Sequence, residues 1–274
     1  MLLKYKQKII CLKKNGAVKT KTILITGSTS GIGLGIANAF AKEGHNIIFN
    51  GLGTNGLQIA EGVASQFNIS YMLSSANMLQ PKALYEMVKV ATEKFGVIDV
   101  LINNAGIQHV SSIEEFSAEK WDAIIGINLT AAFHLSKAVW PGMKGQQFGR
   151  IINIASVHGL LASEYKSAYV AAKHGLVGFT KTAALEGANC GITCNAICPG
   201  YVKTPLVEKQ VADQARVHHL PENEVVQKVI LAKQAIKEFI PVETIAALCL
   251  FLASDTASTI TGAAMPVDAG WSAQ

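Results

Sequence analysis

Short apolar runs alternate along the chain with longer stretches in which apolar and polar positions follow helical spacing. The first run, Thr22 to Thr26, precedes the helical stretch Ile36 to Glu43. Short apolar runs rich in β-branched residues are typical of strands that are buried on both faces. The other runs expected to form strands are Asn46 to Asn50, Ser70 to Leu73, Val97 to Ile102, Arg150 to Ala155, Ile192 to Ile197 and Ala264 to Val267.

Strands that alternate with helices predict an α/β fold with a doubly wound parallel sheet of the Rossmann type. The chain has 274 residues, of which 50% are hydrophobic and 16% charged, and this favours a folded α/β protein over a disordered one. A length of this order is common for one such domain. We therefore expect a single domain over residues 22–274, preceded by a lysine-rich tail over residues 1–21.

The basic excess of the chain lies in the predicted tail. The formal net charge is +5, but residues 1–21 hold seven lysines and no carboxylate, so the rest of the chain carries 17 basic against 19 acidic residues. A basic segment can mark a nucleic-acid or membrane contact. A solvated tail is the simpler interpretation, and we expect neither nucleic acid nor a membrane as a partner.

Targeting signals and cysteines bear on the compartment. The apolar run Ile9 to Leu12 is too short for the core of a signal peptide or for a membrane span. The five cysteines are an odd number, which favours reduced thiols and a cytoplasmic location. Cys190, Cys194 and Cys198 recur at every fourth residue, and we interpret them as core residues of a strand. His218 and His219 would point apart on a helix, so no metal site is expected.

A glycine-rich turn follows the first predicted strand in the pattern Thr-Gly-x3-Gly-x-Gly. Gly27, Gly31 and Gly33 would let the backbone approach a pyrophosphate at the N-terminus of the next helix, where unpaired N–H groups and the helix dipole favour an anion. The turn therefore predicts a dinucleotide site, to which Ser30 and Ile32 also belong.

The choice of dinucleotide is expected to depend on the end of the second strand. An acidic residue there would accept hydrogen bonds from the ribose of NAD, whereas a basic residue would pair with the extra phosphate of NADP. The stretch Ile47 to Gly53 has neither, and Lys and Arg are absent from Asn46 to Gln80. A 2′-phosphate would lack a local counter-charge, so the sequence favours NAD as the cofactor.

Three residues near the middle of the chain suggest proton transfer. Tyr169 and Lys173 stand four apart in a helical stretch, so they share one face of the helix. A neighbouring ammonium favours the phenolate, which predicts a pKa drawn below about 10 and a role for Tyr169 as general base. Ser156 ends an apolar run, where a parallel sheet keeps its ligands. Taken without other motifs, the three residues together are more simply ordinary structural positions.

The spacing Ser-x12-Tyr-x3-Lys, the glycine-rich turn and the run Asn103-Asn104-Ala105-Gly106 together resemble the short-chain dehydrogenase/reductase family. The resemblance implies hydride transfer to a nicotinamide dinucleotide, with Tyr169 as general acid/base and Ser156 bound to the substrate oxygen. It makes Asn128 a fourth catalytic residue, which holds a water linked to Lys173. A homotetramer is expected on the same ground.

The resemblance also assigns contacts to the cofactor. Asn104 is expected beside the cofactor ribose, which Tyr169 and Lys173 would also contact. Asn77 stands where many members of the family carry an aspartate that contacts the adenine. An amide can still form hydrogen bonds there, but the departure weakens the assignment of that one contact.

Several polar residues close to the catalytic positions suggest a small anionic substrate, since a histidine and a lysine can bind a carboxylate. Taken singly, each is more simply a solvated side chain. Similarity to members of the family that oxidise short 3-hydroxy acids implies roles for a set of residues. Gln108, His158, Lys166 and Gln210 would bind the carboxylate, Tyr169 would meet the reacting hydroxyl, and Trp271 would close on the methyl end. Residues 201–240, charged and helix-prone, are expected to form a helical substrate lid.

Three functions follow from these observations. The first is NAD-dependent interconversion of a short D-3-hydroxy acid and its 3-oxo acid. The second is another activity of the same family, such as reduction of a 3-oxoacyl thioester, a sugar or an alcohol. The third is a non-catalytic dinucleotide-binding protein. The candidate carboxylate site counts against the second, and the complete set Asn128, Ser156, Tyr169 and Lys173 counts against the third.

Overall fold

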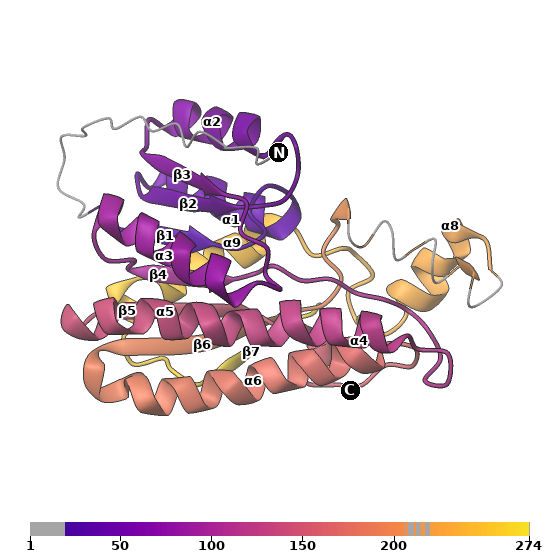
Figure 1. Ribbon diagram of the computed structural model, residues 1–274. Coiled ribbons are helices and arrows are strands. Elements are labelled where there is room, and N and C mark those ends of the chain that lie inside the picture. The colour runs from indigo at the N-terminus through magenta and orange to yellow at the C-terminus, as the bar shows by residue number, and fades with distance from the viewer. Residues whose placement is uncertain (1–19, 206, 208–210, 212–214, 217–219, 274) are drawn as a thin grey trace.

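The computed structural model describes residues 20–273, except residues 206, 208–210, 212–214 and 217–219. Seven parallel strands form one sheet in the order β3-β2-β1-β4-β5-β6-β7 (Figure 1). The strands are β1 (Thr22–Ile25), β2 (Asn46–Asn50), β3 (Tyr71–Ser74), β4 (Val100–Asn103), β5 (Gly149–Ile154), β6 (Ile192–Pro199) and β7 (Ala264–Val267). The predicted doubly wound parallel sheet is confirmed.

Helices cover both faces of this sheet (Figure 1). One face carries α1 (Gly31–Lys42), α2 (Gly56–Phe67) and α9 (Val242–Leu252), with α1 packed between the other two. The opposite face carries α3 (Pro81–Phe95), α4 (Ala118–Ile125), α5 (Ala131–Gly145) and α6 (Ser167–Gly187). A π-helical turn, Gly126–Thr130, joins α4 to α5.

The core forms two layers because side chains alternate between the faces of each strand. In β1, Ile23 and Ile25 belong to the layer that includes α1 and α9, where they join Phe40. Leu24 belongs to the layer that includes α3 and α5. All three β1 side chains are fully buried. Burial of one such side chain contributes about 1.5–3 kcal/mol. The side chains of β1 therefore stabilise the packing of the helices on both faces of the sheet.

The helical run Ala118–Gly145 is long and apolar enough to cross a membrane by length and composition alone. In the structure, α5 packs against α3 and against β4 and β5, while α4 packs against α6. These contacts assign the run to the helical layer of the domain.

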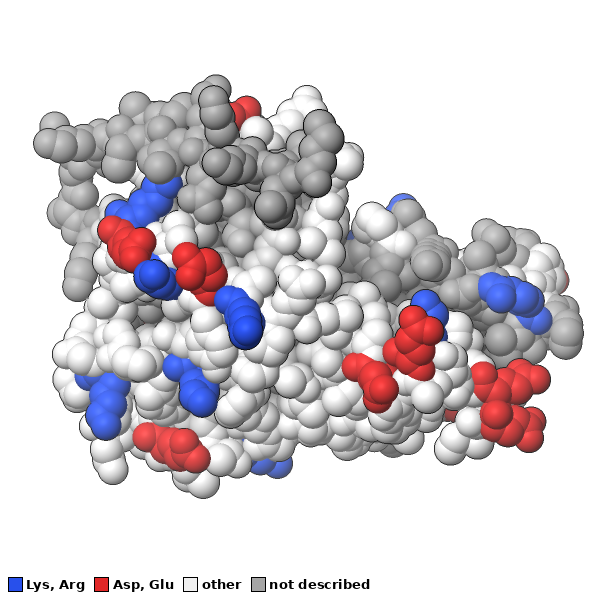
Figure 2. Space-filling model, viewed as in Figure 1, with Lys and Arg blue, Asp and Glu red and all other residues white. Residues whose placement is uncertain are grey.

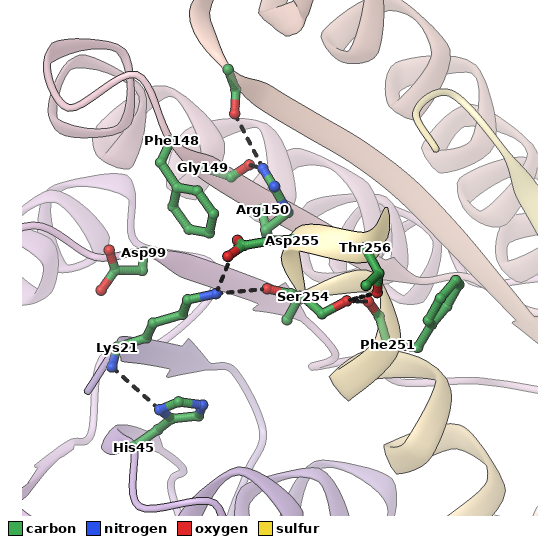
Figure 3. Close-up of polar contacts among 12 residues, drawn as sticks. Lys21, His45, Asp99, Phe148, Gly149, Arg150, Phe251, Ser254, Asp255 and Thr256 are labelled. Atoms are coloured by element: carbon green, nitrogen blue, oxygen red, sulfur yellow. Dashed lines mark hydrogen bonds and ion pairs between the residues drawn. The ribbon is translucent and has the colours of Figure 1, made fainter. Parts of the chain in front are cut away.

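The N-terminal ends of the strands are closed by a group of polar contacts around Lys21 (Figure 3). The Lys21 backbone N–H donates to Nδ1 of His45 at 3.2 Å, and Nζ donates to the carbonyl of Ala253 at 3.1 Å. The Phe148 ring lies near two cations, with Lys21 Nζ 4.6 Å and Arg150 Cζ 4.3 Å from its centroid. Lys21, which the sequence assigned to the tail, therefore belongs to the folded base of the sheet.

The segment predicted as a lid is partly described. It contains α8 (Glu222–Val225) and a π-helical turn, Val226–Ile230. Its buried side chains form a small separate cluster with Trp271 near the C-terminus. Gln210, His218 and His219 lie outside the described residues.

The cysteines of the described chain are free. Cys194 and Cys198 are buried in β6, as expected. Cys190 precedes the strand, in a short 3₁₀ turn, and is only partly buried, so its prediction as a core strand residue is wrong. The reason is the left-handed Gly191, which separates this turn from β6.

Candidate active site

A cleft of about 560 Å³ opens beside the point where the sheet order reverses, between β1 and β4. In an open α/β sheet, the carboxyl ends of the strands diverge here and leave room for a ligand. Most of the residues predicted from the sequence line this one cleft: Gly27, Ser30, Gly31, Ile32, Asn77, Asn104, Gln108, Ser156, His158, Lys166, Tyr169, Lys173 and Trp271. Gly33 and Asn128 lie outside its lining.

The glycine-rich turn makes a cradle that only glycine can form. Gly27 and Gly31 have φ of 62° and 52°, in the left-handed region that favours glycine. A Cβ at Gly33 would lie 2.3 Å from the Gly27 carbonyl oxygen, so a side chain there would force α1 away from the glycine-rich turn. Ser30 precedes α1 without a side-chain capping bond, which leaves N–H groups of the first turn for an anion. The turn fits a dinucleotide pyrophosphate.

Thr26, which sequence reasoning missed, ties this turn to the loop after β4. Its hydroxyl accepts hydrogen bonds from the backbone N–H groups of Asn104 and Ala105, both at 2.9 Å. Asn104 returns the contact, since its Nδ2 donates to the carbonyls of Thr26 at 2.8 Å and Gly27 at 3.2 Å. Asn104 therefore lines the cleft, where its amide holds the wall together, and its contact with the cofactor ribose stays a prediction. The signal for Thr26 was its place as the last residue of the first apolar run.

The cleft wall after β2 is uncharged. Asn50 is buried, and its amide accepts from the Gly27 N–H at 3.3 Å and donates to the carbonyls of Ser74 and Ala76. Sequence reasoning missed this brace, although the asparagine at the strand end marked it. Nearby, Asn77 Oδ1 accepts from the Leu79 N–H at 2.9 Å, in a turn. The wall therefore offers neither a carboxylate nor a cation from the end of β2.

Ser156, Tyr169 and Lys173 come together at the centre of the cleft. Ser156 follows β5, and its hydroxyl accepts from the His158 N–H at 3.1 Å. Tyr169 and Lys173 lie on α6, where Lys173 Nζ stands 5.6 Å from the Tyr169 ring centroid and donates to the Ile154 carbonyl at 2.7 Å. The three groups therefore converge from one strand end and one helix.

The protonation of this group differs from the sequence prediction. Burial raises the pKa of Tyr169 to about 12, the opposite of the expected direction, and the Ser156 hydroxyl lowers it only in part. Burial also lowers the pKa of Lys173 to about 8. Desolvation disfavours the charged form of both groups. The phenol is consequently protonated at neutral pH in this structure.

Asn128 lies behind the cleft in the π-helical turn Gly126–Thr130 and is buried. Its Oδ1 accepts from the Ile107 N–H and its Nδ2 donates to the Ile107 carbonyl, both at 2.9 Å. Both polar groups of the side chain are thus engaged by one backbone residue. Its described contacts hold the loop that leads to Gln108, and its contact with a water linked to Lys173 stays a prediction.

One part of the cleft is a polar pocket around Lys166. Lys166 is 1% exposed, and its Nζ lies 3.4 Å from His158 Nε2 and donates to the Tyr201 hydroxyl at 3.1 Å. The Nε2 of Gln108 is buried and has no hydrogen-bond partner among the residues that the structure describes. The ring of Trp271 meets His158 edge-on, with centroids 5.3 Å apart. A buried cation and an amide donor without a partner among the described residues line the same cleft, and both are suited to a small anion.

Burial controls the charges in this pocket. It lowers the pKa of Lys166 to about 8, with Lys233 adding a smaller repulsion. It also lowers the pKa of His158 to about 3, helped by the Lys166 ammonium, so the imidazole is neutral at neutral pH. The pocket therefore has at most one positive charge of its own, carried by Lys166. Tyr201, which lies between Lys166 and Trp271, was missed by sequence reasoning.

Comparison with known proteins gives concordant results. Residues 27–272 match a family model described as enoyl-(acyl carrier protein) reductase. The chain is 51% identical over 257 residues to a D-beta-hydroxybutyrate dehydrogenase of Rhizobium meliloti (strain 1021), covering 93% of this chain and 100% of the relative. It is also 51% identical to the D-beta-hydroxybutyrate dehydrogenase of Cupriavidus necator, with 93% and 98% coverage.

Among solved structures, a variant of the actinorhodin polyketide ketoreductase with NADPH has the same fold. Its TM-score is 0.88 at 32% sequence identity, and the match covers 92% of this chain and 97% of the ketoreductase.

Proposed function

The chain belongs to the short-chain dehydrogenase/reductase family, and from this premise we propose that it interconverts D-3-hydroxybutyrate and acetoacetate with NAD as cofactor. The observation that carries the proposal is the buried Lys166 ammonium, in the same cleft as Ser156 and Tyr169. A short acid could place its carboxylate at Lys166 and its hydroxyl at Tyr169. The names of the two relatives at 51% identity agree with this substrate.

The cradle at Gly27, Gly31 and Gly33 would hold the dinucleotide pyrophosphate, and Asn104 and Asn77 line the cleft along its length. When bound, the nicotinamide supplies the hydride acceptor for the oxidation. In that direction Tyr169 takes the hydroxyl proton, while Ser156 orients the substrate oxygen and Lys173 favours the phenolate by its charge. In the reverse direction, Tyr169 acts as the general acid, which its pKa, raised by burial to about 12, supports.

NAD is proposed over NADP on the basis of the uncharged wall after β2. The residues that line the cleft there, Asn50 to Gly53 and Asn55, include no cation to pair with a 2′-phosphate. The NADPH-bound relative shares 32% identity with this chain, so NADP is the alternative that the assay must test. The homotetramer and the cytoplasmic location stay predictions, as do the roles of Gln210 and of the lid.

The decisive experiment is NADH formation by purified protein that is offered D- and L-3-hydroxybutyrate separately, with NAD and then with NADP. We expect reduction of NAD with the D-acid alone and a much lower kcat/KM with NADP. If the protein binds NADH but reduces NAD with neither acid, the proposed substrate is wrong. Equal kcat/KM with NAD and NADP would contradict the proposed preference for NAD and would not affect the proposed substrate.

A further inference from the structure

Lys166 and Lys173 are both buried cations that line the candidate cleft, and Lys166 is the one that contacts His158 and Tyr201. Within the described residues, no carboxylate lies within ion-pair distance of its Nζ. The polar partners of Nζ are the Tyr201 hydroxyl at 3.1 Å and His158 Nε2 at 3.4 Å. An ammonium group has three donors, so these two contacts leave one for a ligand. Its position therefore depends on the neutral groups that hold it.

Tyr201 is held from several sides. Its backbone N–H donates to Gln234 Oε1 at 3.1 Å, and its carbonyl accepts from the Ile240 N–H at 2.9 Å. Its ring stacks on Trp271, with centroids 5.6 Å apart and planes inclined by 18°. The side chain is 8% exposed. The hydroxyl is therefore a fixed point of the pocket, presented by the segment that follows β6.

The bond from Lys166 has a defined direction. Burial raises the pKa of Tyr201 to about 12, so the phenol keeps its proton at neutral pH and accepts the ammonium hydrogen through oxygen. Acceptance of a hydrogen bond from the ammonium favours the charged form of Lys166, whereas burial opposes it. The phenol proton is left for a further acceptor, such as a carboxylate oxygen.

We propose that the Tyr201 hydroxyl is a positioning group that fixes the Lys166 ammonium, and that the pair selects a free carboxylate over its neutral ester. The inference rests on the proposed function, because it concerns the carboxylate end of the same substrate. It assigns to Tyr201 a part in specificity and none in hydride or proton transfer. The ring and the hydroxyl have separate tasks, since the ring packs on Trp271 and the oxygen meets Lys166.

The test is Tyr201→Phe, assayed with D-3-hydroxybutyrate and with its methyl ester. The phenyl ring can keep the stack on Trp271, so the ester kcat/KM should stay close to wild type and report a folded site. The acid should lose about tenfold in kcat/KM, or about 1.4 kcal/mol, mainly through KM, since the lost hydrogen bond involves a charged group. Equal losses for acid and ester would overturn the proposal and reduce Tyr201 to a packing residue.

The pH dependence provides a second readout. In wild type, the ratio of kcat/KM for the acid to kcat/KM for the ester should fall above about pH 8, as Lys166 loses its proton. The pKa of Lys173 is also lowered to about 8, but its deprotonation affects both substrates equally and so does not change the ratio. In Tyr201→Phe, which lacks the hydroxyl acceptor, this ratio should begin to fall at a lower pH than in wild type. His158, Tyr201 and Lys233 are the titratable groups that act on or face Lys166. A ratio with an unchanged pH profile in the variant would contradict the proposal.

A matched control and a binding measurement complete the design. Tyr85→Phe removes a phenol that contacts His134 on α5, outside the cleft, and should leave the ratio unchanged. Calorimetric titration of the NADH-loaded protein with acetate measures the anion site without turnover. If wild type fails to oxidise D-3-hydroxybutyrate, the proposed function is wrong. Acetate binding that is weakened about tenfold by Tyr201→Phe would still support the proposed role of the Tyr201 hydroxyl and the Lys166 ammonium in binding a carboxylate. Acetate affinity that is equal in both proteins, or no acetate binding at all, would overturn it.

Discussion

At the scale of single residues, Tyr169 shows how burial and charge compete. The ammonium of Lys173 favours the phenolate, and this argument from spacing predicted a lowered pKa. In the structure Lys173 Nζ donates to the Ile154 carbonyl, and burial dominates at Tyr169, whose pKa is raised to about 12. The sequence could place the two residues on one face of a helix. It could not predict the desolvation, which depends on elements distant in sequence.

The role of Tyr169 leads to the first residue-scale prediction. Tyr169→Phe removes the proton carrier and leaves the ring, so kcat for oxidation of D-3-hydroxybutyrate should fall by about 10³-fold, within the range for a general acid/base. Dinucleotide affinity, measured by quenching of protein fluorescence with NADH, should change by less than about tenfold. Turnover within a few fold of wild type would remove Tyr169 from proton transfer.

At the scale of elements, the regular structure was largely predictable from the sequence. All seven strands overlap the short apolar runs that indicated them. The central strands are buried and need continuous apolar side chains, whereas β7 at the edge of the sheet is not buried. Helix α1 begins at Gly31, earlier than the predicted start at Ile36, since the glycines of the turn also form its first residues. The braces at Thr26 and Asn50 were missed, because each joins loops that only the folded sheet brings together.

The π-helical turn Gly126–Thr130 is the element whose role the sequence described least well. The sequence singled out only Asn128 in this segment, and the structure shows that its buried amide contacts the backbone of Ile107. Ile107 directly precedes Gln108, whose Nε2 is buried in the cleft and finds no partner in the described part of the chain. The turn therefore connects a helical layer to the substrate end of the cleft.

This connection predicts the effect of Asn128→Ala. The change removes both part-buried hydrogen bonds to the N–H and carbonyl of Ile107. It should lower the free energy of unfolding by about 1–3 kcal/mol, because each such bond contributes about 0.5–1.5 kcal/mol. KM for the hydroxy acid should also rise, as Gln108 loses its support. Urea unfolding and initial-rate kinetics measure the two effects.

The control for this experiment is Asn38→Ala on α1, where a part-buried amide donates one bond to the Leu34 carbonyl at 2.9 Å. It should cost about 1 kcal/mol or less and leave KM unchanged. An Asn128→Ala variant as stable as the Asn38→Ala variant would show that the contacts with Ile107 contribute little.

At the scale of the whole molecule, the two ends of the sheet differ in chemistry. The carboxyl ends of the strands open on the candidate cleft, and the amino ends are closed by the contacts around Lys21 (Figure 3). The side of the molecule in Figure 2 that carries α3 and α5 shows Lys and Arg interspersed with Asp and Glu, without a large area of one sign. Each end of the sheet also holds a buried histidine, His45 at the base and His158 in the cleft.

Both buried histidines should make stability fall with acid. Burial lowers the pKa of His158 to about 3 and, with the Lys21 charge, lowers that of His45, which Glu43 and Asp99 partly restore. The unfolded chain takes up these protons near pH 6.5, whereas the folded protein resists them. The stability contributed by the neutral rings is therefore complete above pH 6.5 and is lost progressively below it, down to about pH 3 for His158.

Of the two histidines, His45 provides the sharper test of this pH dependence. It lies at the amino ends of the strands, away from the cleft, and can be changed without altering the substrate pocket. In His45→Asn, the amide oxygen can still accept from the Lys21 N–H, and no proton is taken up. The melting temperature should therefore fall less between pH 7.5 and pH 5 than in wild type, while the two proteins stay close at pH 7.5. His174→Asn, at an exposed position on α6, is the matched control and should keep the wild-type pH dependence. A His45→Asn protein whose melting temperature falls as steeply as that of the control would show that protonation of His45 does not oppose folding, and that the contact with Lys21 survives in acid.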